Sequence, residues 1–225
     1  MTVTPPPRYA LYHAPKPDSL LWRFTSRWLG RDAATGETVE SPFPDWTAEP
    51  RHYGFHATLK PPMVLATGRT EAELLDAASE FARTHHRFEA PPLKLAELGS
   101  FIALVPSAPS ESLDAFAADC VRDFDPFRAA PSPAELEKRR AHGLTARQDE
   151  YLGRWGYAYV FEEFRFHMTL TGSLDDRDRA MALDHLRHAT APFTAAPLVI
   201  DDLTVFKQDS REQPFHIVAR YDLAG

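Results

Sequence analysis

Short runs of alternating apolar and polar residues recur along the chain, separated by stretches in which apolar residues recur at helical spacing. Alternation with a period of two predicts β-strands, and recurrence every three to four residues predicts amphipathic helices. We expect strands at 8–13, 53–59, 93–98, 101–105, 157–161, 164–170, 198–206 and 215–221, and helices at about 18–30, 70–81, 112–124 and 176–189. Because hairpins are mixed with helices, this order predicts an α+β fold with mainly antiparallel sheet.

Capping residues and prolines set the boundaries that we expect for these elements. Asp18 is placed to cap the first helix, and Thr70 and Glu73 have the spacing of a capping box at the start of the second. Pro61 and Pro62 are expected to stop the strand that precedes them, because proline has no N–H to donate to a neighbouring strand.

Residues 131–154 have the pattern of a helical insertion. Ser132 and Glu135 have capping-box spacing, Gly143 is expected to end that short helix, and Thr145 begins a second one. We treat these helices as an insertion into a single domain rather than as a domain of their own.

Composition narrows the kind of partner. Residues 1–225 are long enough for one compact domain, and the formal net charge is −7 at pH 7. Long nucleic acids are bound by a surplus of Lys and Arg, so we expect a small phosphorylated substrate and no long nucleic acid. No apolar run is long enough to cross a membrane, and residues 1–4 do not resemble a signal peptide. We therefore expect a cytoplasmic protein without a membrane partner.

One pentapeptide occurs twice, once in each half of the chain. Phe55–Leu59 reads Phe-His-Ala-Thr-Leu, and Phe166–Leu170 reads Phe-His-Met-Thr-Leu. Both copies lie in expected strands, where side chains alternate between the two faces. Each copy therefore presents one imidazole and one hydroxyl on the same face, with apolar residues on the other face.

This pairing suits the cleavage of a phosphodiester. In-line displacement at phosphorus needs a base for the attacking oxygen and an acid for the leaving oxygen, and histidine serves both roles near neutral pH. Threonine hydroxyls can donate to the non-bridging oxygens, where negative charge accumulates. We expect His56, Thr58, His167 and Thr169 to be the catalytic residues, acting without a metal ion.

The duplicated His-x-Thr-Leu motif resembles the signature of the 2H phosphoesterase superfamily, which includes RNA ligase-like cyclic phosphodiesterases. Residues 51–62, 144–148, 155–160 and 164–172 are also similar to a DUF1045-like subfamily described as phosphonate-metabolism proteins encoded near carbon–phosphorus lyase genes. The resemblance implies two pseudo-symmetric α+β lobes with both motifs lining a central cleft. It also implies a small cyclic phosphate as substrate, such as 5-phosphoribosyl 1,2-cyclic phosphate.

Other residues are candidates for binding the substrate. Lys60 directly follows the first motif and could reach a second phosphate, whereas Thr171 occupies the matching position in the other half. The remaining candidates are Arg139 and Arg140 in the insertion, and the strand residues Tyr12 and Tyr157.

Two further features are expected to be structural. Tyr53 should point to the apolar face, like Phe55, and pack in the core. His52 and His56 are four residues apart in an extended segment, where their rings do not converge, and His185 and His188 lack a further ligand nearby. We expect neither a metal ion nor another cofactor.

Two alternatives remain open from the sequence. One is a 2′,3′-cyclic phosphodiesterase that acts on RNA ends, which the acidic net charge disfavours. The other is a phosphate-binding module without activity, which would not need two proton-transfer groups. The substrate, the bond that is cleaved, the separate roles of the histidines and the oligomeric state are also open.

Overall fold

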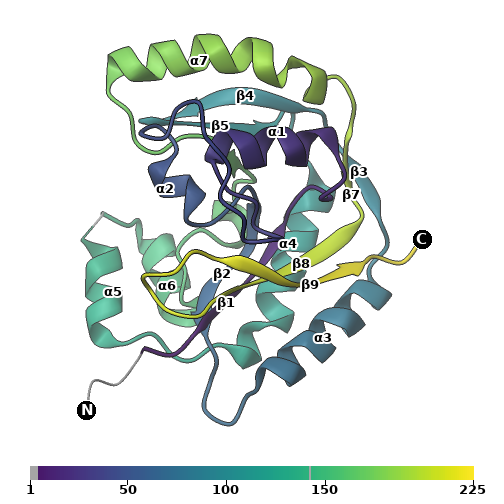
Figure 1. Cartoon of the computed structure of the whole chain (residues 1–225). Coiled ribbons are helices and arrows are strands. Elements are labelled where there is room, and N and C mark those ends of the chain that lie inside the picture. The colour runs from purple at the N-terminus through teal and green to yellow at the C-terminus, as the bar shows by residue number, and fades with distance from the viewer. Residues whose placement is uncertain (1–4, 142) are drawn as a thin grey trace.

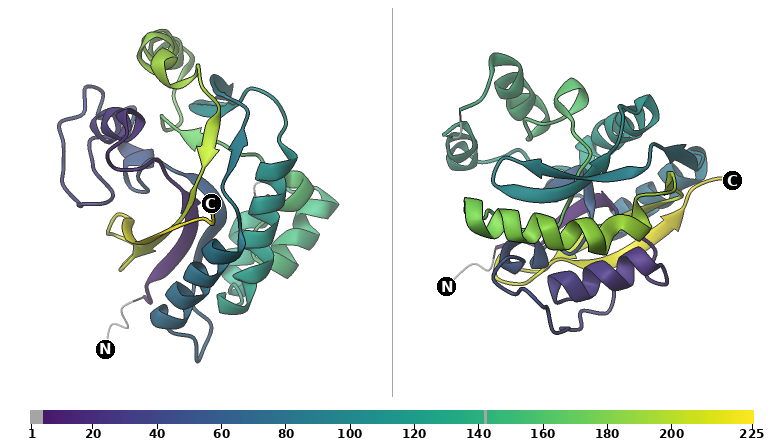
Figure 2. Two further views of the ribbon diagram at one scale, coloured as in Figure 1. Left: turned by 90° about the vertical axis from the view of Figure 1, so that its right-hand side faces the viewer. Right: turned by 90° about the horizontal axis from the view of Figure 1, so that it is seen from above.

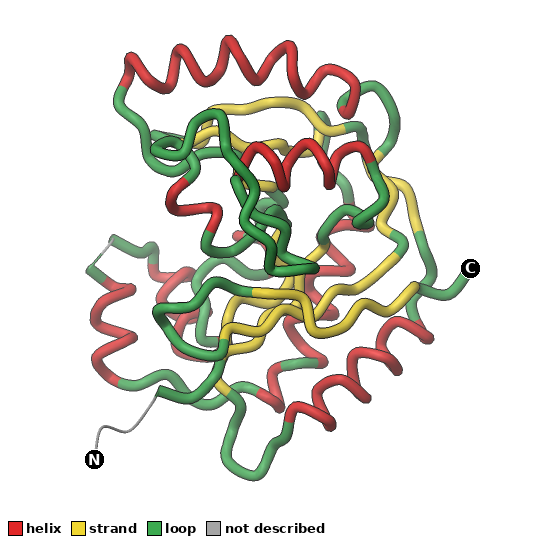
Figure 3. The backbone as a smooth tube through the Cα atoms, viewed as in Figure 1, coloured by secondary structure: helices red, strands yellow, loops and turns green. Residues whose placement is uncertain are grey.

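Seven antiparallel strands form one sheet in the computed structural model, which describes residues 5–141 and 143–225. The strand order is β4-β5-β6-β2-β1-β8-β9, and β3 pairs with β7 separately (Figure 1). The strands are β1 (Arg8–His13), β2 (Ala57–Val64), β3 (Phe88–Ala90), β4 (Leu93–Leu98), β5 (Phe101–Pro106), β6 (Met168–Thr169), β7 (Leu198–Ile200), β8 (Asp202–Gln208) and β9 (His216–Asp222). Figure 3 shows these strands in the middle of the molecule with helices around them. The expected α+β class with antiparallel sheet is confirmed.

The two halves of the sheet meet where β2 lies beside β6. Strands β4 and β5 continue the sheet beyond β6, and β1, β8 and β9 continue it beyond β2. The two expected lobes therefore share one continuous sheet among the described residues, and the two motif-bearing strands are neighbours at its centre.

Helices cover both faces of this sheet. Helix α4 (Glu111–Asp123) packs on β2, and α3 (Glu71–Thr84) packs on β8 and β9. Helix α7 (Asp176–Thr190) packs on β4 and β5, while α1 (Leu20–Leu29) lies on the opposite side of the sheet from α3 and α4 (Figure 2). The short helix α2 (Ala48–Arg51) and the insertion helices α5 (Pro133–Arg140) and α6 (Ala146–Trp155) complete the set of described α-helices.

The helix starts follow the capping signals in the sequence. The expected capping boxes at Thr70 and Ser132 are formed, and a third is formed at Thr145, each with the side-chain and backbone hydrogen bonds in both directions. Helix α1 is capped by Ser19 rather than by Asp18. Local hydrogen bonding thus accounts for these boundaries to within one residue.

Several strand predictions were wrong in extent: the strand expected at 164–170 is only Met168–Thr169, and the one expected at 198–206 is divided into β7 and β8. β2 begins at Ala57 and continues through Pro61 and Pro62, because these prolines lie where its register with β1 shifts and no ladder N–H is required. The segment 157–161 alternates as expected but pairs with no strand among the described residues. Its buried Val160 packs instead against α4 and α6. The alternation therefore arises because one face of this segment packs on helices, and not because the segment is a strand.

A β-bulge in β2 reverses the side-chain direction between Thr58 and Lys60. Thr58 pairs with Tyr12 and Lys60 pairs with Leu11, which leaves one extra residue in β2. Lys60 therefore points into the interior, where its ammonium donates to the Asp125 carboxylate at 2.8 Å and to the Val121 carbonyl at 2.9 Å. The expectation that Lys60 binds a second phosphate of the substrate is wrong for this reason.

No helix among residues 5–141 and 143–225 combines the length and the apolar character needed to cross a membrane. Residues 1–4, on which the expectation about a signal peptide depends, lie outside the described residues.

We expect the Asp125→Asn variant to lose about 3 kcal/mol of unfolding free energy, because it leaves the Lys60 ammonium buried without its charge partner. The matched control is Asp149→Asn, which removes the partner of Arg140 from a pair that is about half exposed on both sides. Exposed pairs contribute about 0–1 kcal/mol. Urea unfolding of both variants provides the measurement, and equal losses would contradict the interior placement of Lys60.

Candidate active site

The two His-x-Thr motifs are brought together by one backbone pair. Ala57 of β2 pairs with Met168 of β6 in antiparallel register. Continuing this register by one residue places His56 opposite Thr169, and Thr58 opposite His167. Residues opposite each other in an antiparallel pair point to the same face, so the four polar side chains share one face.

The opposite face of these strands is buried, as the alternation predicted. Phe55, Ala57 and Leu59 are at most 3% exposed, and Met168 and Leu170 are fully buried. The Trp28 indole of α1 donates to the Leu170 carbonyl at 2.7 Å, which ties the second motif to the helical layer.

Each imidazole is oriented by a backbone carbonyl two residues before it. His56 Nδ1 lies 2.8 Å from the Gly54 oxygen, and His167 Nδ1 lies 2.8 Å from the Arg165 oxygen. A carbonyl can only accept, so Nδ1 carries the proton in both rings, and Nε2 of each neutral ring is left with a free lone pair. Thr58 Oγ1 lies 3.3 Å from His56 Nε2.

The two histidines differ in their surroundings. His56 stacks on the buried ring of Tyr12, with a centroid distance of 3.8 Å and an interplanar angle of 20°. Burial lowers the pKa of His56 to about 4, and the nearby His167 contributes to this lowering, while the bond to Gly54 opposes it. His56 is therefore neutral at neutral pH. His167 instead lies where the cavity of His56 meets a second groove, of about 520 Å³.

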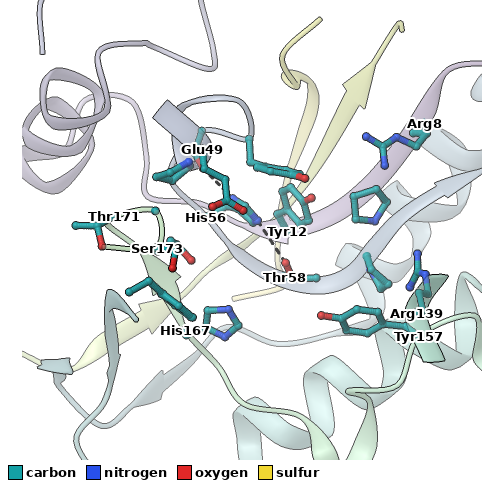
Figure 4. Close-up of a pocket in the computed structure, with 18 residues that line it drawn as sticks. Arg8, Tyr12, Glu49, His56, Thr58, Arg139, Tyr157, His167, Thr171 and Ser173 are labelled. Atoms are coloured by element: carbon teal, nitrogen blue, oxygen red, sulfur yellow. Dashed lines mark hydrogen bonds between the residues drawn. The ribbon is translucent and has the colours of Figure 1, made fainter. Parts of the chain in front are cut away.

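A cavity of about 580 Å³ contains both histidines and both threonines. Figure 4 shows Arg8, Arg139 and Tyr157 on one side of the histidine pair, and Thr171 and Ser173 on the other. The lining residues are Arg8, Tyr12, Glu49, Pro50, Tyr53, Gly54, His56, Thr58, Pro61, Pro62, Phe101, Arg139, Tyr157, His167, Thr169, Thr171, Gly172 and Ser173.

The structure separates the remaining substrate-binding candidates. Tyr12, Tyr157 and Arg139 line the cavity, whereas Arg140 does not. Consecutive residues of a helix point about 100° apart, and Arg140 turns toward α6, where it pairs with Asp149 at 2.6 Å. The expectation for Arg140 is therefore corrected.

Several lining residues were missed in the sequence. Tyr53 packs against the core through Phe215, as expected, but it also lines the cavity, because Gly54 has a φ of +79° and breaks the alternation before β2 begins. Arg8 lies four residues before Tyr12 on β1, and Thr171 lies two residues after Thr169. Period-two spacing from the predicted residues could have identified both.

No group of three or more His, Cys, Asp or Glu side chains suited to holding a metal ion occurs among residues 5–141 and 143–225. The expectation that the site works without a metal ion remains a prediction.

Solved structures with a similar overall arrangement include Escherichia coli LigT complexed with 3′-AMP. That superposition has a TM-score of 0.46 and 10% sequence identity, and it covers 98% of this chain and 100% of LigT. A second structure, described as a phosphoesterase, has a TM-score of 0.44 and 12% identity, with 98% and 100% coverage.

Two curated relatives are described as ribose 1,5-bisphosphate phosphokinase PhnN. The protein from Janthinobacterium sp. (strain Marseille) is 38% identical over 231 residues, which cover 97% of this chain and 51% of that protein. The protein from Laribacter hongkongensis (strain HLHK9) is 39% identical over 177 residues, which cover 76% and 41%. The chain thus spans about half the length, or less, of the curated relatives that it matches.

Residues 58–216 match the model of a protein family described as "Protein of unknown function (DUF1045)". The matched segment includes Thr58 and the whole second motif, with His167 and Thr169. The similarity to a DUF1045-like subfamily that the sequence indicated is confirmed, and the chain belongs to the DUF1045 family.

Proposed function

We propose that this chain hydrolyses a small cyclic phosphodiester, with His56 as the general base and His167 as the general acid. The observation that supports this most is the pairing of Ala57 with Met168, which places two carbonyl-oriented imidazoles in one cavity. A binding module would need neither the matched orientation nor two groups able to transfer protons.

The reaction proposed is a single in-line displacement by water. His56 Nε2 accepts a proton from water as the water oxygen bonds to phosphorus, and the bond from phosphorus to one ring oxygen breaks. His167, protonated at the start, donates its Nε2 proton to that leaving oxygen. Thr58 and Thr169 donate hydrogen bonds to the non-bridging oxygens, whose charge increases in the transition state. The product is a phosphomonoester with a free hydroxyl group.

The roles follow from the different surroundings of the two rings. A base must begin neutral, and burial against Tyr12 keeps His56 in that form. The acid is then the other imidazole of the pair, His167, which lies at the junction of two grooves.

For the substrate we propose 5-phosphoribosyl 1,2-cyclic phosphate, as an intermediate of phosphonate catabolism. Breaking its bond between phosphorus and O2 yields ribose 1,5-bisphosphate, the compound for which the two curated relatives are named as kinases. A cavity of about 580 Å³ is also within the range of about 300–1,000 Å³ that is usual for small ligands.

We expect His56→Ala and His167→Ala each to lower kcat by about 10²–10⁴-fold, the usual contribution of one acid–base group. Thr58→Val and Thr169→Val should lower it by about 10²-fold, as for the loss of one oxyanion donor. The control is His188→Ala, an exposed α7 histidine that should leave kcat unchanged. Turnover of a panel of cyclic phosphates, with and without EDTA, provides the measurement.

Three outcomes would count against this function. Activity restored only by added metal ions would require a metal-dependent reaction. A preference for 2′,3′-cyclic ends of RNA would support the RNA-end alternative. Near-normal turnover by either histidine variant would contradict the acid–base pair.

The pH profile should reveal the lowered pKa of His56. Protonating His56 removes the base, so kcat/KM should fall on the acid side, with a limb nearer pH 4 than the pH 6.5 of an ordinary histidine. Tyr12→Ala admits water beside His56, which lessens desolvation, raises the pKa and moves this limb to higher pH. An acid limb at pH 6.5 in the unmodified protein, or one that Tyr12→Ala leaves in place, would exclude a His56 of lowered pKa as the base.

A further inference from the structure

Two arginines line the same side of the cavity and have no carboxylate partner among the described residues. Arg8 comes from β1 and Arg139 from the insertion helix α5 (Figure 4). The guanidinium of Arg8 donates to the Gln208 Oε1 through Nε at 2.7 Å and also through Nη2. Arg139 Nη1 donates to the Gly156 carbonyl at 2.9 Å. Both groups donate to neutral acceptors, and neither forms an ion pair among the described residues; the neighbouring carboxylate, Glu135, is paired with Arg211.

Neighbouring arginines, by contrast, form ion pairs with carboxylates. Arg128 pairs with Asp125 at 2.8 Å, Arg140 with Asp149 at 2.6 Å and Arg211 with Glu135 at 3.4 Å. A second, smaller cavity of about 260 Å³ adjoins the first and shares both Arg8 and Arg139 with it. Its lining also includes Arg128, Arg211 and one carboxylate, Glu135, so arginines outnumber carboxylates around this space and it can hold an anion.

The groups around these arginines are preorganised. The Arg8 guanidinium lies 5.2 Å from the Phe215 ring centroid, and the Arg139 guanidinium lies 5.8 Å from the Tyr157 ring centroid. Tyr53 stacks on Phe215 at 5.4 Å. No hydrogen bond within the described part of the chain engages the hydroxyl of Tyr53 or of Tyr157, so both remain able to donate to a bound oxyanion.

The opposite end of the cavity carries hydroxyl groups and a carboxylate instead of arginines. Thr171 and Ser173 line it together with Gly172, and the Glu49 carboxylate lies beside Gly172. A carboxylate repels a phosphate group, whereas it accepts hydrogen bonds from sugar hydroxyls. The two ends therefore distinguish the two ends of a substrate that carries a phosphate at one end only.

We propose that Arg8 and Arg139 form a second anion subsite, which binds a phosphomonoester group of the substrate at a distance from the diester that is cleaved. This inference rests on the proposed function and narrows it to cyclic phosphates of sugars that carry a further phosphate. The planar guanidinium group suits bidentate binding of phosphate oxygens. The insertion thus contributes to specificity, through the first of its two helices.

The test compares 5-phosphoribosyl 1,2-cyclic phosphate with ribose 1,2-cyclic phosphate. Each charge-assisted contact contributes about 10- to 100-fold, so we expect the unmodified protein to prefer the phosphorylated compound by about 10²–10⁴-fold in kcat/KM. Arg8→Gln and Arg139→Gln should each reduce this preference by about 10- to 100-fold. The control, Arg140→Gln, changes the next residue of the same helix and should preserve the preference.

Calorimetric binding of ribose 5-phosphate to each folded variant separates the subsite from the reaction. Binding that weakens in Arg8→Gln and Arg139→Gln but not in Arg140→Gln supports the subsite, even if neither cyclic compound is hydrolysed and the proposed function fails. Hydrolysis of both compounds at equal rates leaves the proposed function intact and overturns the subsite. A strong preference that survives both arginine variants also overturns it, because the second phosphate would then bind elsewhere.

Discussion

The pairing of Ala57 with Met168 is the contact on which the site depends, because it relates the two motifs by a local two-fold arrangement. Each histidine then lies across from the threonine of the other motif, and the apolar residues between them anchor both strands in the core. Neither motif could form the site alone. β6 has only two residues, so its position depends on its neighbours β5 and β2 and on the Trp28 bond to the Leu170 carbonyl.

The surroundings of the two motifs depart from the two-fold symmetry. His56 is enclosed by Tyr12, while His167 lies at the junction of two grooves. The cavity is likewise unequal at its two ends, with Arg8 and Arg139 on one side and Thr171 and Ser173 on the other. In the function that we propose, the repeated motif supplies two acid–base groups, and the unequal residues around it distinguish base from acid and one end of a substrate from the other.

Much of this could be predicted from the sequence, and the errors have local physical causes. Period-two alternation identified the polar face of both motifs, and capping boxes located the helix starts. Lys60 was misplaced because a one-residue bulge reverses side-chain direction without any signal in composition. The position of Tyr53 in the cavity lining was missed because the left-handed conformation of Gly54 interrupts the strand. Register and backbone handedness depend on contacts between distant segments, which single-sequence patterns do not contain.

The most direct test of the account is the protonation of the His56 ring, measured by ¹⁵N NMR of the imidazole nitrogens with the His56→Ala variant for assignment. We predict a neutral ring at pH 7 with its proton on Nδ1, bonded to the Gly54 carbonyl, that becomes doubly protonated only as the pH falls toward about 4. A ring that is protonated at pH 7, or that carries its single proton on Nε2, could not act as the base and would contradict the account.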